Sequence, residues 1–235
     1  MSVPYNIVTR QAAIRINAIV GAIPTTLQTN YIVDPLTTTQ VESSIFPLAA
    51  IQDAVLSAEE RLAHAIADNA THPWRQSLIE VTADLANLDV LPSVANGGAP
   101  IIGAWGPVRD SDTFEICSEM SLDQVRRRVR NANSNLVCPV YWYNIAGGQI
   151  AHTRTNVVIE CCVYDRDAQS TSLQADGDIL LPDVLEAAYT AGAVAVLMRD
   201  DEFMQQAQVY ARYFEQTLEM IAKSMTGVVP LMEAA

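Results

Sequence analysis

The sequence has little lysine and histidine and lacks the short motifs that most often mark an active site. Lys223 is the only lysine, and the three histidines, His64, His72 and His152, form no His-Glu-x-x-His pattern. The sequence contains no Gly-x-Ser-x-Gly turn and no Gly-x-x-x-x-Gly-Lys-Ser/Thr loop. These absences argue against a zinc protease, an elbow-type serine hydrolase and a P-loop nucleotide enzyme. We therefore predict that the chain is not an enzyme and holds no cofactor or metal ion.

Cysteines and long apolar runs are also scarce. Cys117, Cys138, Cys161 and Cys162 contain no pair at zinc-ribbon spacing, and neighbours 161 and 162 would point to opposite faces of a strand. We expect four reduced, buried thiols. No basic segment followed by an apolar core marks a signal peptide, and the apolar stretch 14–23 is too short to span a bilayer. We expect an intracellular product with no membrane partner.

The charge balance is acidic. There are 27 acidic and 14 basic residues, which gives a formal net charge of −13. Proteins that grip nucleic acid normally present a basic surface, so this balance argues against tight phosphate binding. It is compatible with a surface from which DNA is repelled, and also with simple solubility.

Three parts of the chain carry the apolar period of about 3.6 residues that indicates amphipathic helices. Two of them are residues 8–22 and about 47–68, and Glu59 and Arg61 fall outside most of the apolar positions of the second. Residues 182–227 predict two amphipathic helices folded back on each other. Pro182 suits a first helical position, and Gly227 suits the end of the hairpin.

The middle of the chain favours strands, because apolar and polar residues alternate there. In the clearest strand Val157, Ile159, Cys161 and Val163 share one face. The predicted order is a strand at 78–85 (with a helix as the alternative), a Pro- and Gly-rich ordered loop at 92–112, a helix at 122–130, a hairpin of 137–145 and 149–153, a strand at 156–164 and a polar loop at 165–181.

The fold class that follows is mainly α with a small antiparallel β region. Residues 1–72 and 182–227 form a helical bundle that the C-terminal helical hairpin closes. Residues 73–181 form a β-containing extension, which includes a β-hairpin from the middle of the chain. Residues 228–235 form a C-terminal tail.

The most unusual local feature is a group of four arginines on the helix at 122–130. Arg126, Arg127, Arg128 and Arg130 would spread round most of that helix, so they make no single nucleic-acid-reading face. The simplest interpretation is a solvated helix end whose cations complement the helix dipole. A second interpretation is pairing with carboxylates of a neighbouring copy of this acidic chain, and phosphate contact is the third.

Two apolar segments are further candidates for binding a partner. Tyr141, Trp142 and Tyr143 form an aromatic cluster that could anchor a partner, although core packing is the more ordinary explanation. The tail after the last helix either docks back or inserts into a partner. Its residues are Gly227, Val228, Val229, Leu231 and Met232. The acidic pairs Asp110/Asp112 and Asp176/Asp178 are better explained as solvated loops than as cation ligands.

The order of several weak motifs resembles the head-to-tail connector adaptor proteins of tailed bacteriophages, the ring component below the portal. The likeness runs from about residue 75 onward. Its residues are Leu181–Ala188, Ala191-Gly192-Ala193, the helix from Asp200 through Tyr210, Tyr213 and Phe214, the segment Ile101–Asp110 and the hairpin Val140–Ile150. The Thr-rich region 24–46 departs from the expected pattern.

This resemblance implies a structural virion protein with a helical body and β extensions. It implies a homo-oligomeric ring of twelve copies in the virion neck, made in the host cytoplasm, that lengthens the DNA channel. The C-terminal tail would wedge into the portal protein, and the β region, including Tyr141, would receive the next tail or nozzle protein. DNA would pass through without specific binding.

Two other functions stay open from the residues alone. One is an intracellular helical regulator or small-ligand binding protein with a pocket in the bundle. The other is an enzyme whose site is built from dispersed acidic residues.

Overall fold

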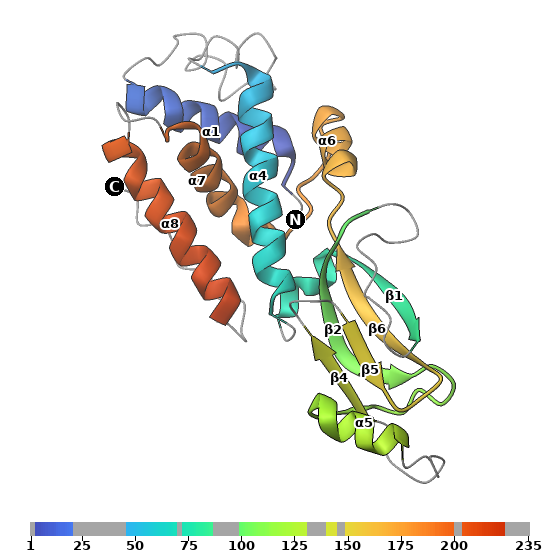
Figure 1. Ribbon diagram of the computed structural model, residues 1–235. Helices are drawn as coiled ribbons and strands as arrows, with labels where there is room; N and C mark the ends of the chain where they lie inside the picture. The colour runs from blue at the N-terminus through green and yellow to red at the C-terminus, as the bar shows by residue number, and fades with distance from the viewer. Residues whose placement is uncertain are drawn as a thin grey trace. The chain divides into compact units, whose positions relative to one another are not determined.

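The chain forms two compact units, which the computed structural model describes for residues 3–20, 46–69, 72–86, 99–130, 140–144, 149–199 and 204–223 (Figure 1). The helical unit comprises Met1–Leu78 and Asp165–Ala235, and the β unit comprises Ile79–Tyr164. The chain therefore begins the helical unit, inserts the β unit and then completes the first unit. The predicted fold class, mainly α with a small antiparallel β region, is confirmed.

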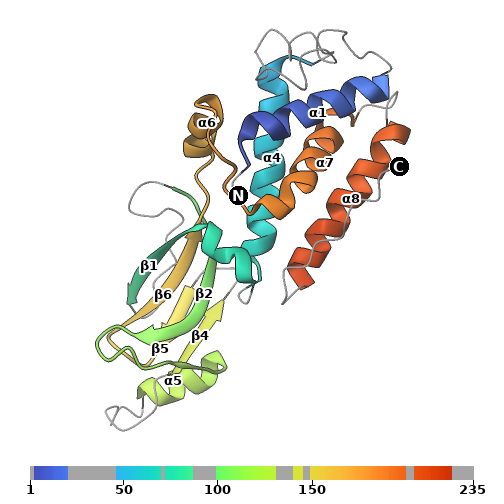
Figure 2. The same cartoon turned by 180° about the vertical axis from the view of Figure 1, so that it is seen from behind.

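In the part of the helical unit that the structure describes there are four long helices (Figure 2). They are α1 (Tyr5–Val20), α4 (Leu48–Ala67), α7 (Glu186–Leu197) and α8 (Met204–Lys223). Two short 3-10 turns, η1 (Pro73–Ser77) and η3 (Asp183–Leu185), and helix α6 (Arg166–Gln174) complete it. The predicted helices at 8–22 and 47–68 are confirmed as α1 and α4, although α1 begins three residues earlier.

Helix α7 lies at the centre of this unit, where it packs against α1, α4 and α8. Every residue from Ala188 to Val194 is buried, so the prediction that both C-terminal helices are amphipathic is wrong for α7. Small side chains permit this burial. A Cβ on Gly192 would lie 2.6 Å from the Ala58 Cβ and 2.8 Å from Phe214 Cε2, so only glycine lets α4 and α8 approach here.

Helix α8 is amphipathic as predicted and pairs with α7 to form the expected hairpin. Its buried apolar side chains Ala207, Phe214 and Ile221 recur every seven residues, and Thr217 is buried beside them. The exposed side of α8 is mostly polar, although Val209 is an exposed apolar residue on it. Arg61 of α4 lies over the Phe214 ring, with its guanidinium carbon 4.9 Å from the ring centre.

Residues 165–181 contain helix α6, so the prediction of a loop for the whole segment is wrong. Asp165 caps this helix by accepting a hydrogen bond from the Ala168 N–H at 3.0 Å. Only Gln169 and Leu173, one turn apart, are buried. The apolar period of α6 is therefore too short to recognise in the sequence. The segment 165–181 belongs to the helical unit.

The described residues of the β unit form two three-stranded sheets. The first has the order β1-β6-β2 and is antiparallel, and the second has the order β3-β4-β5, in which β3 runs parallel to β4. The elements are β1 (Ile79–Ala86), β2 (Ile101–Asp110), β3 (Ser118–Glu119), α5 (Leu122–Arg130), β4 (Val140–Asn144), β5 (Gln149–His152) and β6 (Asn156–Val163). Residues of both sheets share one apolar core, which includes Leu85, Val108, Ile150 and Ile159.

Most sequence predictions for the described residues of this unit hold, but strands β2 and β3 were not predicted, and residues 92–98, 137–139 and 145 of the predicted loop and hairpin lie outside the described residues. Helix α5 has the predicted bounds, and β1, β6 and the β4–β5 hairpin are confirmed. Residues 101–110 form a strand and not the predicted loop. Its pairing with β6 shifts register between Ile101 and Gly103 and between Trp105 and Arg109. These irregularities accommodate the glycines and Pro107 in an edge strand, which explains why the composition suggested a loop.

The described cysteines are free and buried, as predicted. Cys117 and Cys161 lie in the core of the β unit and Cys162 beside it on β6, whereas Cys138 lies outside the described residues. Burial raises the pKa of Cys117 and of Cys161 to about 11. These thiols are therefore protonated at neutral pH and serve as small apolar side chains.

Candidate functional site

Helix α5, which carries the four arginines, begins at a capping box. Ser121 Oγ lies 3.4 Å from the Gln124 N–H, and Gln124 Oε1 accepts from the Ser121 N–H at 3.1 Å and from its hydroxyl at 3.0 Å. The side chains of Val125 and Ala151 pack together, with Met120 and Leu122 against them. The cap and this contact fix the helix against β4 and β5.

The arginines of α5 project from that anchored helix. Arg126, Arg127 and Arg130 are exposed and Arg128 is half-buried. In the described part of the β unit, the ion pairs join Arg154 to Asp110 and Glu115 and do not involve the α5 arginines. The helix therefore presents concentrated positive charge to solvent on an otherwise acidic chain.

The other predicted partner-binding residues are described only in part. In β4 the Tyr141 side chain is half-buried and packs against the β-unit core, which is the core-packing interpretation of this residue. The side chains of Trp142 and Tyr143 lie outside the described set. The tail residues 227–232 also lie outside the described residues.

A structured turn at residues 111–116 connects β2 to β3 and is a surface that the sequence did not single out. The Asp110 carboxylate accepts hydrogen bonds from the N–H groups of Asp112 at 2.9 Å and Thr113 at 3.1 Å. This turn holds Phe114 at a positive φ of 57°, and the residue is 64% exposed. Ile116 is 56% exposed. Two large apolar side chains are thus held in solvent on an ordered turn.

Asp110 is the electrostatic centre of this turn. Its Oδ2 lies 2.7 Å from Arg154 Nε, and both side chains are largely buried. Burial raises the pKa of Asp110, but the two backbone donors and the Arg154 charge outweigh it, so the net effect is a lowered pKa. Asp110 is consequently a structural carboxylate, and the predicted solvated loop is wrong for this residue.

The helical unit contains a buried polar network centred on Glu59 of α4. Glu59 is 0% exposed and accepts a hydrogen bond from the Tyr189 hydroxyl at 2.6 Å and one from the Leu180 N–H at 3.3 Å. The Tyr5 hydroxyl lies 2.8 Å and 2.7 Å from its two oxygens and 3.1 Å from Gln169 Oε1. The sequence prediction that Glu59 lies outside the apolar face of its helix is therefore wrong.

This network joins segments that are far apart in the sequence. Tyr5 comes from α1, Glu59 from α4, Gln169 from α6 and Tyr189 from α7. Burial, then the charge of Glu59 and the hydrogen bond to it, raise the pKa of Tyr189 well above its usual value. Because Tyr5, Glu59 and Tyr189 are 0% exposed, their polar atoms contact the protein and not a dissolved substrate. Their arrangement positions helices.

Surface ion pairs add further links within the helical unit. Arg166 of α6 binds Asp53 and Glu60 of α4, with both contacts at 2.6 Å. Arg61 binds Glu215 of α8 at 2.6 Å. Such exposed pairs contribute about 0–1 kcal/mol each, so the buried Glu59 network and the close packing at Gly192 matter more for stability.

Comparison with protein-family models gives no match to this chain, and comparison with curated proteins gives no significant match. Over the part of the chain that the structure describes, no three His, Cys, Asp or Glu side chains gather as metal ligands. Among those same residues, no helix is both long enough and apolar enough to cross a bilayer.

Proposed function

We propose that this protein is a structural adaptor of the head-to-tail connector of a tailed bacteriophage. Copies form a ring under the portal, extend the DNA channel and dock the next tail protein. The protein is made in the host cytoplasm and resides in the neck of the virion. It turns over no substrate and carries no cofactor.

The observation that carries this proposal is the order of the segments that resemble the adaptor family. In the structure, residues 181–197 contain η3 and α7. The helix that follows is α8, the second helix of the hairpin. Residues 101–110 and 140–150 correspond to β2 and to the β4–β5 hairpin. The first group belongs to the helical unit and the second to the β unit. A body of packed helices with a separate β unit supports a protein that links different partners.

The charge distribution supports the same function. A net charge of −13 repels DNA phosphates, which suits a channel wall along which DNA must slide without binding. The exposed arginines of α5 are a local exception on the β unit, where a protein contact can use them. Rigid anchoring of α5 by its cap and by Val125 supports a binding role, since a preordered surface loses less entropy on association.

Portal binding tests the proposal directly. The chain is mixed with the assembled portal ring of the same phage, and complex formation is measured by native mass spectrometry. Deletion of residues 226–235 should abolish binding and leave the circular dichroism spectrum and thermal midpoint of the chain nearly unchanged. Binding that survives the deletion removes the role proposed for Val228, Val229, Leu231 and Met232.

Failure of the full-length chain to bind any portal ring contradicts the function itself. A homodimer that holds a small molecule tightly would instead support the helical regulator. Turnover of a substrate, lost on substitution of a defined residue, would support an enzyme.

A further inference from the structure

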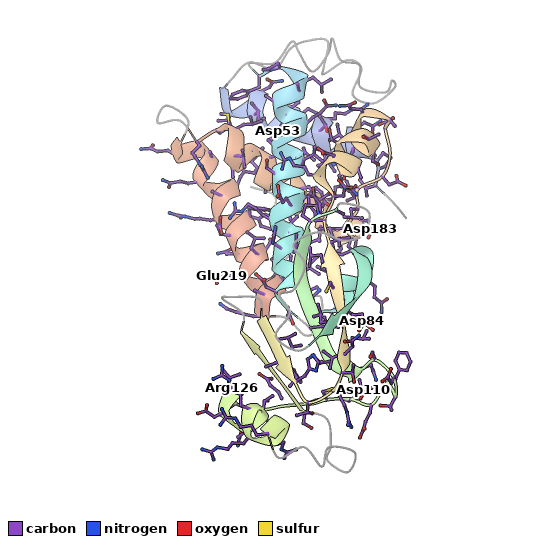
Figure 3. All side chains as sticks on the ribbon, turned by 45° about the vertical axis from the view of Figure 1, so that its right-hand side comes forward. Asp53, Asp84, Asp110, Arg126, Asp183 and Glu219 are labelled. Carbon is purple, nitrogen blue, oxygen red and sulfur yellow. The ribbon has the colours of Figure 1, made fainter. Side chains whose placement is uncertain are left out.

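Among the described residues of the β unit, no acidic side chain forms an ion pair with the arginines of α5. Four arginines and a single acid, Asp123, lie within the nine residues of α5. Arg126 and Arg130 are four residues apart, so they lie on one side of the helix, and both are exposed. Figure 3 shows Arg126 on α5 and Asp110 at the end of β2, both at the same end of the β unit.

The helical unit carries a complementary acidic segment. Residues 165–186 contain six acids and one arginine. Asp53 and Glu60 of α4 compensate the positive charge of that arginine, Arg166. Its charge therefore does not offset the acids of its own segment. The exposed acids of the segment are Asp167, Asp176, Asp178 and Asp183. We call residues 165–186 the acidic segment.

We propose that α5 of one copy docks on the acidic segment of a second copy. The two surfaces differ and belong to different units, so the contact is head-to-tail. Head-to-tail contacts close into rings when the rotation between copies is suitable and otherwise give open filaments. The inference rests on the proposed function, because in a ring of identical copies the same contact is repeated between every pair of neighbours.

Electrostatics favours a second copy over nucleic acid as the occupant. The chain as a whole repels phosphate, and four arginines spread round a helix do not form a groove that follows a nucleic-acid backbone. Two copies of like net charge also repel each other, but salt screens that repulsion beyond about 8–10 Å at physiological ionic strength. Arginine and carboxylate groups in direct contact are screened much less, and arginine can bind carboxylate in a bidentate manner. Local complementarity therefore decides the contact.

A charge-exchange experiment tests the contact. The first variant carries Arg126→Glu with Arg130→Glu, and the second carries Asp167→Lys with Asp178→Lys. Each variant alone opposes like charges, so self-association measured by sedimentation velocity should weaken about tenfold, equivalent to about 1.4 kcal/mol. An equimolar mixture of the two variants pairs opposite charges in both contacts and should recover association. The chain that carries all four substitutions should recover it as well.

A matched control separates the contact from net charge. The control variant carries Arg15→Glu with Arg212→Glu, at exposed residues of α1 and α8. It changes the net charge by the same amount as Arg126→Glu with Arg130→Glu and should leave association unchanged. The inference is overturned if the mixture fails to recover, if the control weakens association equally, or if the wild-type chain stays monomeric. It is also overturned if Arg126→Glu with Arg130→Glu instead abolishes retention of duplex DNA in a gel-shift assay. Portal binding by the wild-type chain is measured separately, so the proposed function can stand when this contact fails.

Discussion

Replacing Glu59 with leucine removes the acceptor at the centre of the buried network in the helical unit. The change leaves the hydroxyls of Tyr5 and Tyr189 and the Leu180 N–H without the oxygen that they contact at 2.6–3.3 Å. A buried donor left without its acceptor typically costs about 1–3 kcal/mol, and three donors lose theirs here. Total stability of a domain is about 5–15 kcal/mol, so we expect Glu59→Leu to lose a large share of it. Glu59→Gln keeps one acceptor oxygen and should lose about 1–3 kcal/mol.

The assay is urea unfolding followed by circular dichroism at neutral pH, with free energies from linear extrapolation. Glu60→Gln is the matched control, since it removes the same charge one residue away. Its partner Arg166 binds it at a partly exposed site, so the control should lose at most about 1 kcal/mol. If Glu59→Leu costs no more than Glu60→Gln, the network does not hold the helices together and the reasoning is refuted.

Three further predictions concern single positions. Gly192→Ala should destabilise the helical unit by about 1–2 kcal/mol in urea unfolding, because overpacking against Ala58 and Phe214 outweighs the gain in helix propensity, and the double variant with Ala58→Gly should cost less than the sum of the two single variants. The pKa of Tyr189 is raised, so its contribution to stability is complete below its unfolded pKa of about 10 and is lost as pH rises through its folded pKa. Stability should therefore fall above about pH 10 more steeply in the wild type than in Tyr189→Phe. Phe114→Asn should raise the thermal midpoint of the β unit, since asparagine tolerates a positive φ and relief of that strain is worth about 1 kcal/mol.

Each of these has a clear contrary outcome. Gly192→Ala with wild-type stability would show that the helices can separate slightly at no cost. Identical alkaline profiles for the wild type and Tyr189→Phe would show that this hydroxyl is not the group that titrates. A lower midpoint for Phe114→Asn would show that the Phe114 side chain makes a stabilising contact despite its exposure.

Regular periods in the sequence predicted most of the elements. Helix α5 and the β4–β5 hairpin came from clear local signals, a helical stretch of nine residues and strands flanking a Gly-Gly turn. Strand β2 was missed because glycines and Pro107 suggest a loop, whereas register shifts against β6 let an edge strand contain them. Helix α6 was missed because only two of its residues are buried.

The buried network could not be predicted from local patterns. Glu59 lies on the buried face of α4, and its burial depends on tyrosines 54 residues before it and 130 residues after it in the chain. The nearest signal in the sequence is Tyr189 in the mostly apolar helix α7, but it does not indicate that Tyr189 pairs with Glu59. The arginines of α5 were found as a charge cluster, but their exposure required the position of Val125 against Ala151.

Native mass spectrometry of the chain with its assembled portal ring tests the central claim most directly. A structural adaptor predicts a discrete complex in which copies of the chain occupy the ring, twelve if the likeness to the adaptor family extends to copy number. A chain that remains free at every ratio of chain to portal, while retaining its folded spectrum, would contradict the account.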